Sequence, residues 1–210
     1  MQGIEDGLLL REHAHRVAND LAVAAAALRL AERRVGADPM IASAIARLDA
    51  SAQVQRLLCV RPSGSTVDLP SALAQLCGAM ALAHAGQEGF AINVSGGSLP
   101  VGDGDGDARL IAMCVNELVG NALRHAGPQG GHGGVCVEVG DDGTSTTVAV
   151  TDTGGPRDWS RTGGQGTGIV DQLAGCLGGT VVRSVSAAGG RVAIAMPSLI
   201  ATAADILEDA

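Results

Sequence analysis

The segment "NELVGNALRHAG", Asn116 to Gly127, decides how this chain of 210 residues is interpreted. Polar residues interrupt an otherwise apolar helical pattern, and Glu117 lies four residues before Asn121, which lies four residues before His125. Residues four apart share one face of a helix. A carboxylate and an amide on one face offer the hard oxygen ligands that a hydrated Mg²⁺ prefers. We therefore favour a metal-binding helix face over an ordinary solvated surface.

The composition excludes several classes of protein. Hydrophobic residues make up 46% of the chain, enough for a core, but the only aromatic residues are Phe90 and Trp159. The net charge of −8 argues against nucleic-acid binding and against an anionic membrane surface, which both require clustered basic residues. All 14 Lys and Arg residues are arginines, which excludes the P-loop and Schiff-base lysines. A triphosphate would have to be bound through backbone N–H groups, Mg²⁺, Arg or His.

The five cysteines form neither a CxxC pair nor a zinc-ligand spacing, so we expect reduced, buried thiols. No apolar run reaches the roughly 18 residues of a membrane span, and the first residues lack the apolar core of a signal peptide. These patterns predict a cytoplasmic location without membrane insertion.

The first 62 residues predict a helical hairpin. A first helix over 4–34 is followed by "VGADP", Val35 to Pro39, which supplies a C-cap glycine, an N-cap aspartate and a first-turn proline for a second helix over 40–60. Apolar residues of the first helix recur at steps of three and four, as in a heptad seam: Leu10, Ala14, Val17, Leu21, Ala24, Leu28 and Ala31. One hairpin leaves this seam exposed, so we expect a homodimer that forms a four-helix bundle.

A second domain is predicted over 66–198, after a linker at Arg61 to Thr66. Its pattern of helix, strand, helix, two strands, helix and two strands is typical of a two-layer α/β sandwich, with helices on one face of a mixed sheet. Residues 199–210 form a tail with a weak helical pattern. The fold class is thus a helical hairpin followed by an α/β domain.

Two glycine-rich segments of this domain could bind a nucleotide. In "VTDTGGP", Val150 to Pro156, Asp152 ends a strand, where its carboxylate could accept from an exocyclic amine while a flat base lies over the glycines. In "GGQGTGIVDQLAGCLGG", Gly163 to Gly179, glycines lead into a helix and would present free N–H groups to phosphate. Each signal is weak alone, but their order and spacing are specific.

Together these segments resemble the N, G1 and G2 boxes of histidine kinase catalytic domains in the GHKL ATPase superfamily. The first helix contains "HRVANDLAV", which resembles the H box of the HWE and HisKA-type kinases. The resemblance extends from about Leu8 to Pro197. It implies a GHKL-type ATP-binding domain for residues 66–198, a dimerisation and histidine-phosphotransfer domain for residues 1–62, and ATP and Mg²⁺ as cofactors.

The resemblance also implies roles for individual residues. His15 would be the phosphoacceptor, and Asn121 would ligate Mg²⁺ with help from Asn116 and Glu117. Arg124 and His125 would flank the phosphates, and Asp152 would bind the adenine amine. The pocket and lid would be shaped by Gly154, Gly164 and Gly166. The seam places His13 beside the buried stripe and His15 at an outward position. Asn19, one turn after His15, could orient a water for dephosphorylation of a receiver.

These residues predict a protein histidine kinase of a two-component system, which autophosphorylates His15 and passes the phosphoryl group to an aspartate of a response-regulator receiver domain. The expected partners are a second copy of the chain, the receiver and a separate sensor protein. Departures from the family pattern, among them Ala18 for a lysine and Pro156 in the G1 box, leave open a phosphotransfer protein with a degenerate nucleotide domain. A weaker alternative is an anti-sigma-type protein kinase.

Other residues have simpler explanations. In "GDGDGD", Gly102 to Asp107, the carboxylates have the spacing of a calcium loop, but position twelve is Cys114 where a bidentate glutamate is required. We interpret the segment as a turn in which Asp107 caps the next helix. His84 and His132 are expected to be structural.

Overall fold

The computed structural model describes residues 2–58, 66–83, 91–102, 106–125, 134–153, 165–187 and 189–200, with side chains from residue 16 onward except those of 57–58, 124–125 and 165–167. The chain divides into two compact units. Unit 1 comprises 1–60 and 78–86, and unit 2 comprises 61–77 and 87–210. In the described part of the chain, no helix is both long enough and apolar enough to cross a membrane.

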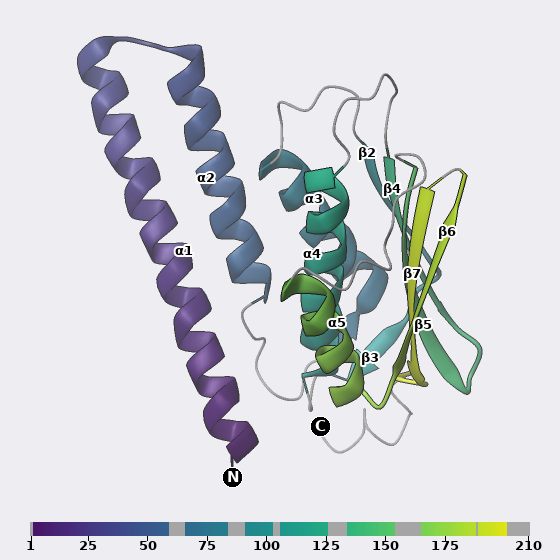
Figure 1. The fold of residues 1–210 in the computed structure, drawn as a ribbon. Coiled ribbons are helices and arrows are strands. Elements are labelled where there is room, and N and C mark those ends of the chain that lie inside the picture. Colours follow the sequence, from purple (N-terminus) through teal and green to yellow (C-terminus); the bar gives the residue numbers. More distant parts are fainter. Residues whose placement is uncertain are drawn as a thin grey trace. The chain divides into compact units, whose positions relative to one another are not determined.

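Unit 1 contains the predicted helical hairpin of α1 (Gln2–Val35) and α2 (Pro39–Leu58), shown in Figure 1. Gly36 ends α1 with a φ of 95°, and its N–H donates to the carbonyl oxygen of Glu32 at 2.9 Å. The Asp38 carboxylate accepts from the N–H of Met40 at 2.8 Å and caps α2. An ion pair between Arg29 and Asp49 joins the two helices. The turn therefore has the glycine, the cap and the proline that the sequence predicts.

The buried stripe of α1 differs from the predicted seam. Leu21 and Leu28 are partly buried as expected, but Ala24 and Ala31 are exposed. Among the side chains of α1 described from residue 16 onward, the buried ones are Ala18 and Ala25. The prediction was wrong at the alanines because the run Ala24 to Ala27 offers no contrast between faces. A straight helix also drifts away from a strict seven-residue repeat.

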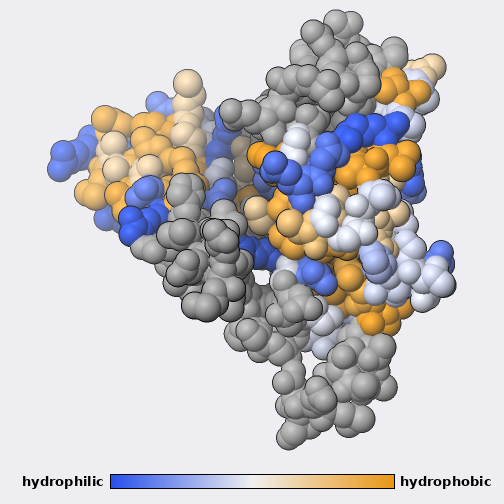
Figure 2. Space-filling model, turned by 60° about the horizontal axis from the view of Figure 1, so that its bottom comes forward, coloured by the Kyte–Doolittle hydropathy of each residue, from blue (hydrophilic) through white to orange (hydrophobic). Residues whose placement is uncertain are grey.

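Unit 1 exposes large apolar side chains at Val23, Leu30, Val35 and Met40. Figure 2 shows much hydrophobic surface, in orange, on the hairpin at the left. A two-helix hairpin cannot bury all sides of both helices. The exposed residues fit the expectation that the hairpin pairs with another chain.

Unit 2 is built on a five-stranded mixed sheet of order β2-β4-β5-β7-β6, in which β2 and β4 are parallel and the other neighbours antiparallel. Helices α4 and α5 cover one face of this sheet (Figure 1). Helix α3 (Leu69–Ala83) precedes the sheet in the chain, and its C-terminal part is assigned to unit 1. The bounds of the sheet strands and the two covering helices are β2 Ala91–Ser95, α4 Asp107–His125, β4 Gly134–Asp141, β5 Ser145–Asp152, α5 Gln165–Cys176, β6 Thr180–Ser186 and β7 Gly189–Pro197.

The core of unit 2 lies between this sheet and its helices. Every second residue of β4, from Val135 to Val139, is buried, and β7 alternates in the same way from Val192 to Met196. The period of two is the pattern of a sheet with one buried face. This is the α/β sandwich that the sequence predicts.

Two details differ from the sequence analysis. A small second sheet pairs β1 (Thr66–Asp68) with β3 (Pro100–Gly102), and neither strand was predicted because three residues carry no period. Helix α5 begins at Gln165, so it includes Gly166 and Gly168, although the sequence suggests that the glycines precede the helix. Glycine is tolerated there because the N–H groups of a first helical turn make no intrahelical bonds. The predicted terminal helix lies outside the described residues from 201 onward.

The cysteines are free thiols where the structure describes them, at Cys77, Cys114, Cys136 and Cys176. Burial raises the pKa of Cys77 and of Cys114 to about 12, so these two are inert core residues as predicted. Cys176 is exposed near the end of α5, which the sequence analysis did not expect.

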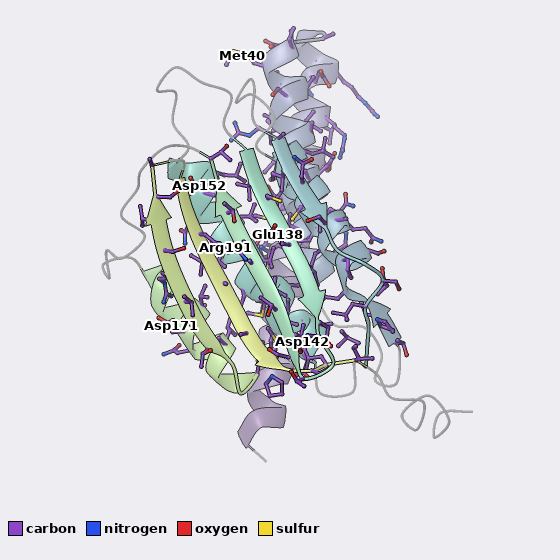
Figure 3. All side chains as sticks on the ribbon, turned by 90° about the vertical axis from the view of Figure 1, so that its right-hand side faces the viewer. Met40, Glu138, Asp142, Asp152, Asp171 and Arg191 are labelled. Atoms are coloured by element: carbon purple, nitrogen blue, oxygen red, sulfur yellow. The ribbon has the colours of Figure 1, made fainter. Side chains whose placement is uncertain are left out.

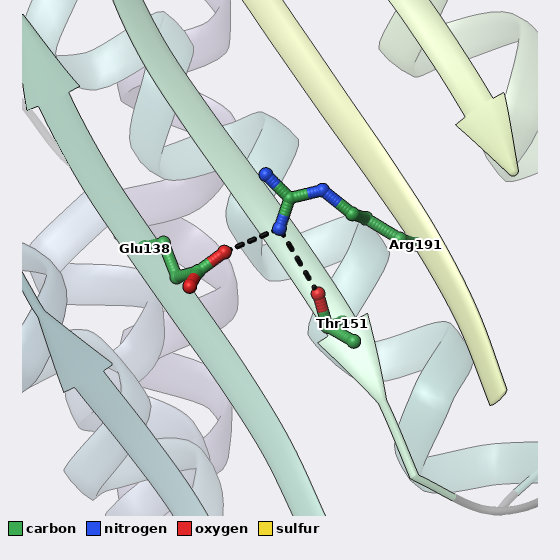
Figure 4. A network of polar contacts seen from close by, with 3 residues as sticks. All are labelled: Glu138, Thr151 and Arg191. Carbon is green, nitrogen blue, oxygen red and sulfur yellow. Dashed lines mark hydrogen bonds and ion pairs between the residues drawn. The ribbon is translucent and has the colours of Figure 1, made fainter. Parts of the chain in front are cut away.

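The face of the sheet opposite the helices carries a small polar network (Figures 3 and 4). The Arg191 guanidinium on β7 forms an ion pair with Glu138 on β4 and lies 3.4 Å from the Thr151 hydroxyl on β5. About half of each charged side chain is exposed, at 43% and 50%. Such a pair stabilises a fold by at most about 1 kcal/mol. It joins three strands without contributing to the core.

Asp68 connects the small sheet to α3. Its carboxylate accepts from the Ser71 hydroxyl, from the N–H of Leu99 at 2.9 Å and from the Ser98 hydroxyl at 2.9 Å. It also accepts from the N–H of Ser71 at 3.3 Å and thereby caps α3. The hydrogen bond from the Ser71 hydroxyl is the largest cause that holds the pKa of Asp68 below its ordinary value of 3.8, and the other bonds lower the pKa further.

Asp68→Asn is expected to reduce the sensitivity of the fold to acid. A carboxyl whose pKa is lower in the folded state stabilises the fold above its ordinary pKa, and this contribution disappears as the pH falls through the folded value. The urea midpoint of the wild type should therefore decrease more steeply than that of the variant between about pH 5 and about pH 2. Equal slopes for the two proteins would contradict this role of Asp68.

Candidate functional site

One end of the main sheet gathers the segments that the sequence singles out. There β4 begins at Gly134, and Val135 pairs with Asp152, the last residue of β5. Helix α4 ends at His125 and is the element that precedes β4 in the chain. Helix α5 runs back to the start of β6, and the ion pair of Asp171 with Arg183 at 2.9 Å aligns it with that strand. The first turn of α5 therefore lies toward the same end of the sheet.

Asp152 is the most deeply buried carboxylate among the described residues. It is 1% exposed and follows Val148 and Val150 on the helix-covered side of β5. Figure 3 shows Asp152 near one end of the sheet and Asp142, in the β4–β5 turn, near the other. Burying an ionisable group is costly unless polar partners receive it. Its position at a strand end, before a glycine-rich segment, is where the sequence predicts a base-binding carboxylate.

Thr153 fixes the strand end next to Asp152. Its N–H donates to the carbonyl oxygen of Gly134 at 2.9 Å, and the N–H of Gly134 donates to the Thr153 hydroxyl at 2.8 Å. This pair of bonds connects the end of β5 to the start of β4. It therefore fixes the strand end that carries Asp152 against the first residue of β4.

Helix α4 presents a polar face at the predicted positions. Asn116, Glu117 and Asn121 are partly exposed, whereas the opposite face is buried. The buried face consists of Ile111, Cys114, Val115, Leu118, Val119, Ala122 and Leu123. The helical period therefore places Glu117 and Asn121 on one accessible face, as the sequence analysis expects.

The remaining predicted residues are described to different extents. His15 is within α1, and Asn19 is exposed one turn later. Arg124 and His125 form the end of α4 and Gly166 belongs to the first turn of α5, but their side chains are outside the described set. Gly154 and Gly164 are outside the described residues, as are His84, His132 and residues 103–105 of the "GDGDGD" segment.

The residues present fit a nucleotide with Mg²⁺ better than a metal held by protein alone. In the described residues, no group of three or more His, Cys, Asp or Glu side chains could hold a metal ion. Magnesium in phosphate-binding sites is commonly held by one or two protein ligands together with phosphate oxygens and water. Asn121, with Glu117 and Asn116 beside it, offers such a partial ligand set, and Asp152 offers a separate acceptor for a base.

Sequence reasoning did not identify two residues of this region, Thr153 and Gly189. Thr153 follows Asp152 directly, but its bonds to Gly134 depend on the antiparallel register of β4 and β5. Gly189 is the first residue of β7 and packs against the peptide group of Asp152. In the sequence it belongs to "AAGG", which is typical of a simple hairpin turn.

Comparisons with known proteins agree with this architecture. Residues 12–84 match the family model HisKA_2, described as histidine kinase. No curated protein matches the chain in sequence. The histidine kinase domain of the Erythrobacter litoralis EL346 blue-light activated histidine kinase is similar over 92% of this chain and 94% of that chain, with 22% identity and a TM-score of 0.60.

Two further solved structures are similar. The longer form of the EL346 kinase matches 90% of this chain at 22% identity with a TM-score of 0.58, and this chain spans 60% of it. The Acinetobacter baumannii histidine kinase AdeS matches over 81% of this chain and 91% of that chain, at 17% identity and a TM-score of 0.53. Residues 12–84 thus match the HisKA_2 family model, and the chain shares the fold of the EL346 histidine kinase domain, a helical hairpin followed by an α/β domain.

Proposed function

We propose that the chain is an ATP-dependent protein histidine kinase that phosphorylates its own His15 and passes the phosphoryl group to an aspartate of a receiver domain. The observation that supports this most is the buried Asp152 at the end of β5, in the same unit as the Asn121 face of α4. The phosphoacceptor His15 lies in the other unit, on a helix within the matched residues 12–84.

The proposed reaction balances with the residues available. A nitrogen of the His15 imidazole attacks the γ-phosphorus of ATP, the bond from that phosphorus to the bridging oxygen breaks, and ADP leaves. Glu117, the carboxylate on the Asn121 face, accepts the proton that the imidazole loses. An aspartate of the receiver then attacks the phosphorus, the N–P bond breaks and the imidazole recovers a proton. Such transfers depend on positioning and on neutralisation of phosphate charge.

The absence of lysine from the sequence determines how the phosphates are bound. Mg²⁺ held by Asn121 would neutralise phosphate charge, with Asn116 and Glu117 supporting it. Arg124 and His125, at the end of the same helix, would contribute positive charge and hydrogen bonds. The first turn of α5 supplies backbone N–H groups that need acceptors, and helix N-termini favour anions.

We propose a homodimer formed by the hairpin, a receiver domain as phosphate acceptor, and a separate sensor protein that supplies the input. The apolar side chains exposed on the hairpin support the dimer. The free thiols of the described cysteines fit the reducing cytoplasm, where we place the reaction. Asn19, exposed one turn after His15, would orient a water when a phosphorylated receiver binds.

Nucleotide binding tests this proposal against the phosphotransfer alternative. Titration calorimetry with ATP should detect binding that weakens when Mg²⁺ is chelated. Asn121→Ala is expected to bind ATP with an affinity that no longer depends on Mg²⁺, because the protein ligand to the metal is lost. Asn93→Ala, at an exposed asparagine of β2, should behave as wild type.

A protein that binds no ATP in this titration, yet accepts phosphate on His15 from a phosphorylated receiver, would support the phosphotransfer module and exclude the kinase. Labelling of a serine in another protein, with His15 dispensable, would instead support the anti-sigma-type kinase.

A further inference from the structure

Gly189 makes an unusually close contact with the candidate base-binding residue. It is buried at the start of β7 with a φ of 150°, a backbone conformation that favours glycine. A Cβ atom placed on it would lie 1.9 Å from the carbonyl oxygen of Asp152 and 2.8 Å from the carbonyl carbon. It would also lie 3.2 Å from the Oδ1 atom of the Asp152 carboxylate. No other residue can occupy this position unless the end of β5 moves.

The surroundings of Gly189 prevent it from moving aside. Gly189 pairs with Ser186 in the β6–β7 hairpin, and the Ser186 hydroxyl donates to its carbonyl oxygen at 3.1 Å. The next residues of β7 are in register with β5, where Arg191 pairs with Thr151. On the other side of β5, Thr153 is bonded to Gly134. The peptide group of Asp152 is therefore held between the β6–β7 hairpin and β4.

We propose that Gly189 is a positioning residue of the nucleotide site, which sets the Asp152 carboxylate where it accepts from the exocyclic amine of adenine. The inference rests on the proposed function, because it gives a binding task to Asp152. Gly189 does not touch the base in this account. It acts through Asp152, because its bare Cα lets the β6–β7 hairpin support the strand end without crowding the carboxylate.

A glycine that only stabilises the fold would change nucleotide affinities in a different way from a glycine that positions Asp152. Loss of folded protein lowers the apparent affinity for every nucleotide by the same factor. Displacement of the Asp152 carboxylate weakens only those nucleotides that donate to it. Inosine triphosphate carries an oxygen where ATP carries the exocyclic amine, and a hydrogen on the neighbouring N1. The ratio of its dissociation constant to that of ATP therefore reports the contacts to this edge of the base, where the Asp152 carboxylate is the proposed acceptor.

The test compares this ratio in the wild type, Gly189→Ala and Gly179→Ala. Gly179 is a matched control, because a Cβ there would lie 2.8 Å from the carbonyl oxygen of Ala195, between α5 and β6 and away from Asp152. A hydrogen bond to a charged group corresponds to a preference for ATP of about 10- to 100-fold. We expect the wild type and Gly179→Ala to keep this preference and Gly189→Ala to lose most of it. A wild-type ratio in Gly189→Ala would overturn the proposal.

Two additions keep the outcome decisive. If Gly189→Ala does not fold, Ser186→Ala, which removes only the hydroxyl bond to Gly189, takes its place and should lower the ratio in the same direction. If the wild type binds neither nucleotide, the proposed function fails. Hydrogen exchange of the Thr153 N–H then tests whether Gly189 positions the end of β5. Faster exchange at Thr153 in Gly189→Ala but not in Gly179→Ala supports the positioning of the strand end, and unchanged exchange overturns it.

Discussion

Asp152→Asn is expected to weaken ATP binding by about 10- to 100-fold while the protein keeps its fold, because the substitution removes the charge of the acceptor. The carboxylate is 1% exposed, so water cannot replace it as a partner of the exocyclic amine. The asparagine amide has nearly the same shape, but one of its two polar atoms is a donor and would face the amine of adenine unfavourably.

Calorimetric titration with ATP, together with thermal unfolding, measures this effect. Asp142→Asn is a suitable control, because Asp142 lies in the β4–β5 turn at the other end of the sheet (Figure 3). It should bind ATP as the wild type does. Wild-type affinity in Asp152→Asn, with unchanged melting, would show that the base is bound elsewhere.

His15→Ala is expected to abolish autophosphorylation completely, whereas His13→Ala should retain it. Residues 13 and 15 both belong to α1, and an advance of two residues turns a helix by about 200°. Positions 13 and 15 therefore lie on different sides of the helix, and we expect that one histidine does not substitute for the other. The sequence of α1 contains no histidine besides His13 and His15, so we expect that removal of His15 leaves no acceptor.

The measurement is transfer of labelled phosphate from ATP to each variant, with acid lability and base stability identifying phosphohistidine. Both variants should bind ATP as the wild type does, because the substituted residues lie in the hairpin. Full labelling of His15→Ala with loss of labelling in His13→Ala would reverse the assignment.

The elements of the chain could be predicted where local signals were strong. Gly36, Asp38 and Pro39 define the α1–α2 turn, because a left-handed glycine, a capping carboxylate and a fixed φ each act within a few residues. The face of α1 was harder to predict, because its alanines carry almost no hydrophobic contrast. The short strands β1 and β3 could not be predicted, since their pairing depends on residues more than 30 positions apart.

The candidate site was predictable only where it depends on local sequence signals. Asp152 follows an alternating strand and precedes glycines, so its place at a strand end is visible in the sequence. The contact of Gly189 with Asp152 is not visible, because it depends on how β7 pairs with β5. The bonds between Thr153 and Gly134 likewise depend on register, which local patterns do not specify.

The measurement that tests the central claim most directly is the site of phosphorylation after incubation of the intact protein with ATP and Mg²⁺. We predict that mass spectrometry at neutral to basic pH finds one phosphoryl group on His15 and that chelation of Mg²⁺ prevents its formation. Absence of phosphate on His15, in a protein that is folded and supplied with both ATP and Mg²⁺, would contradict the account.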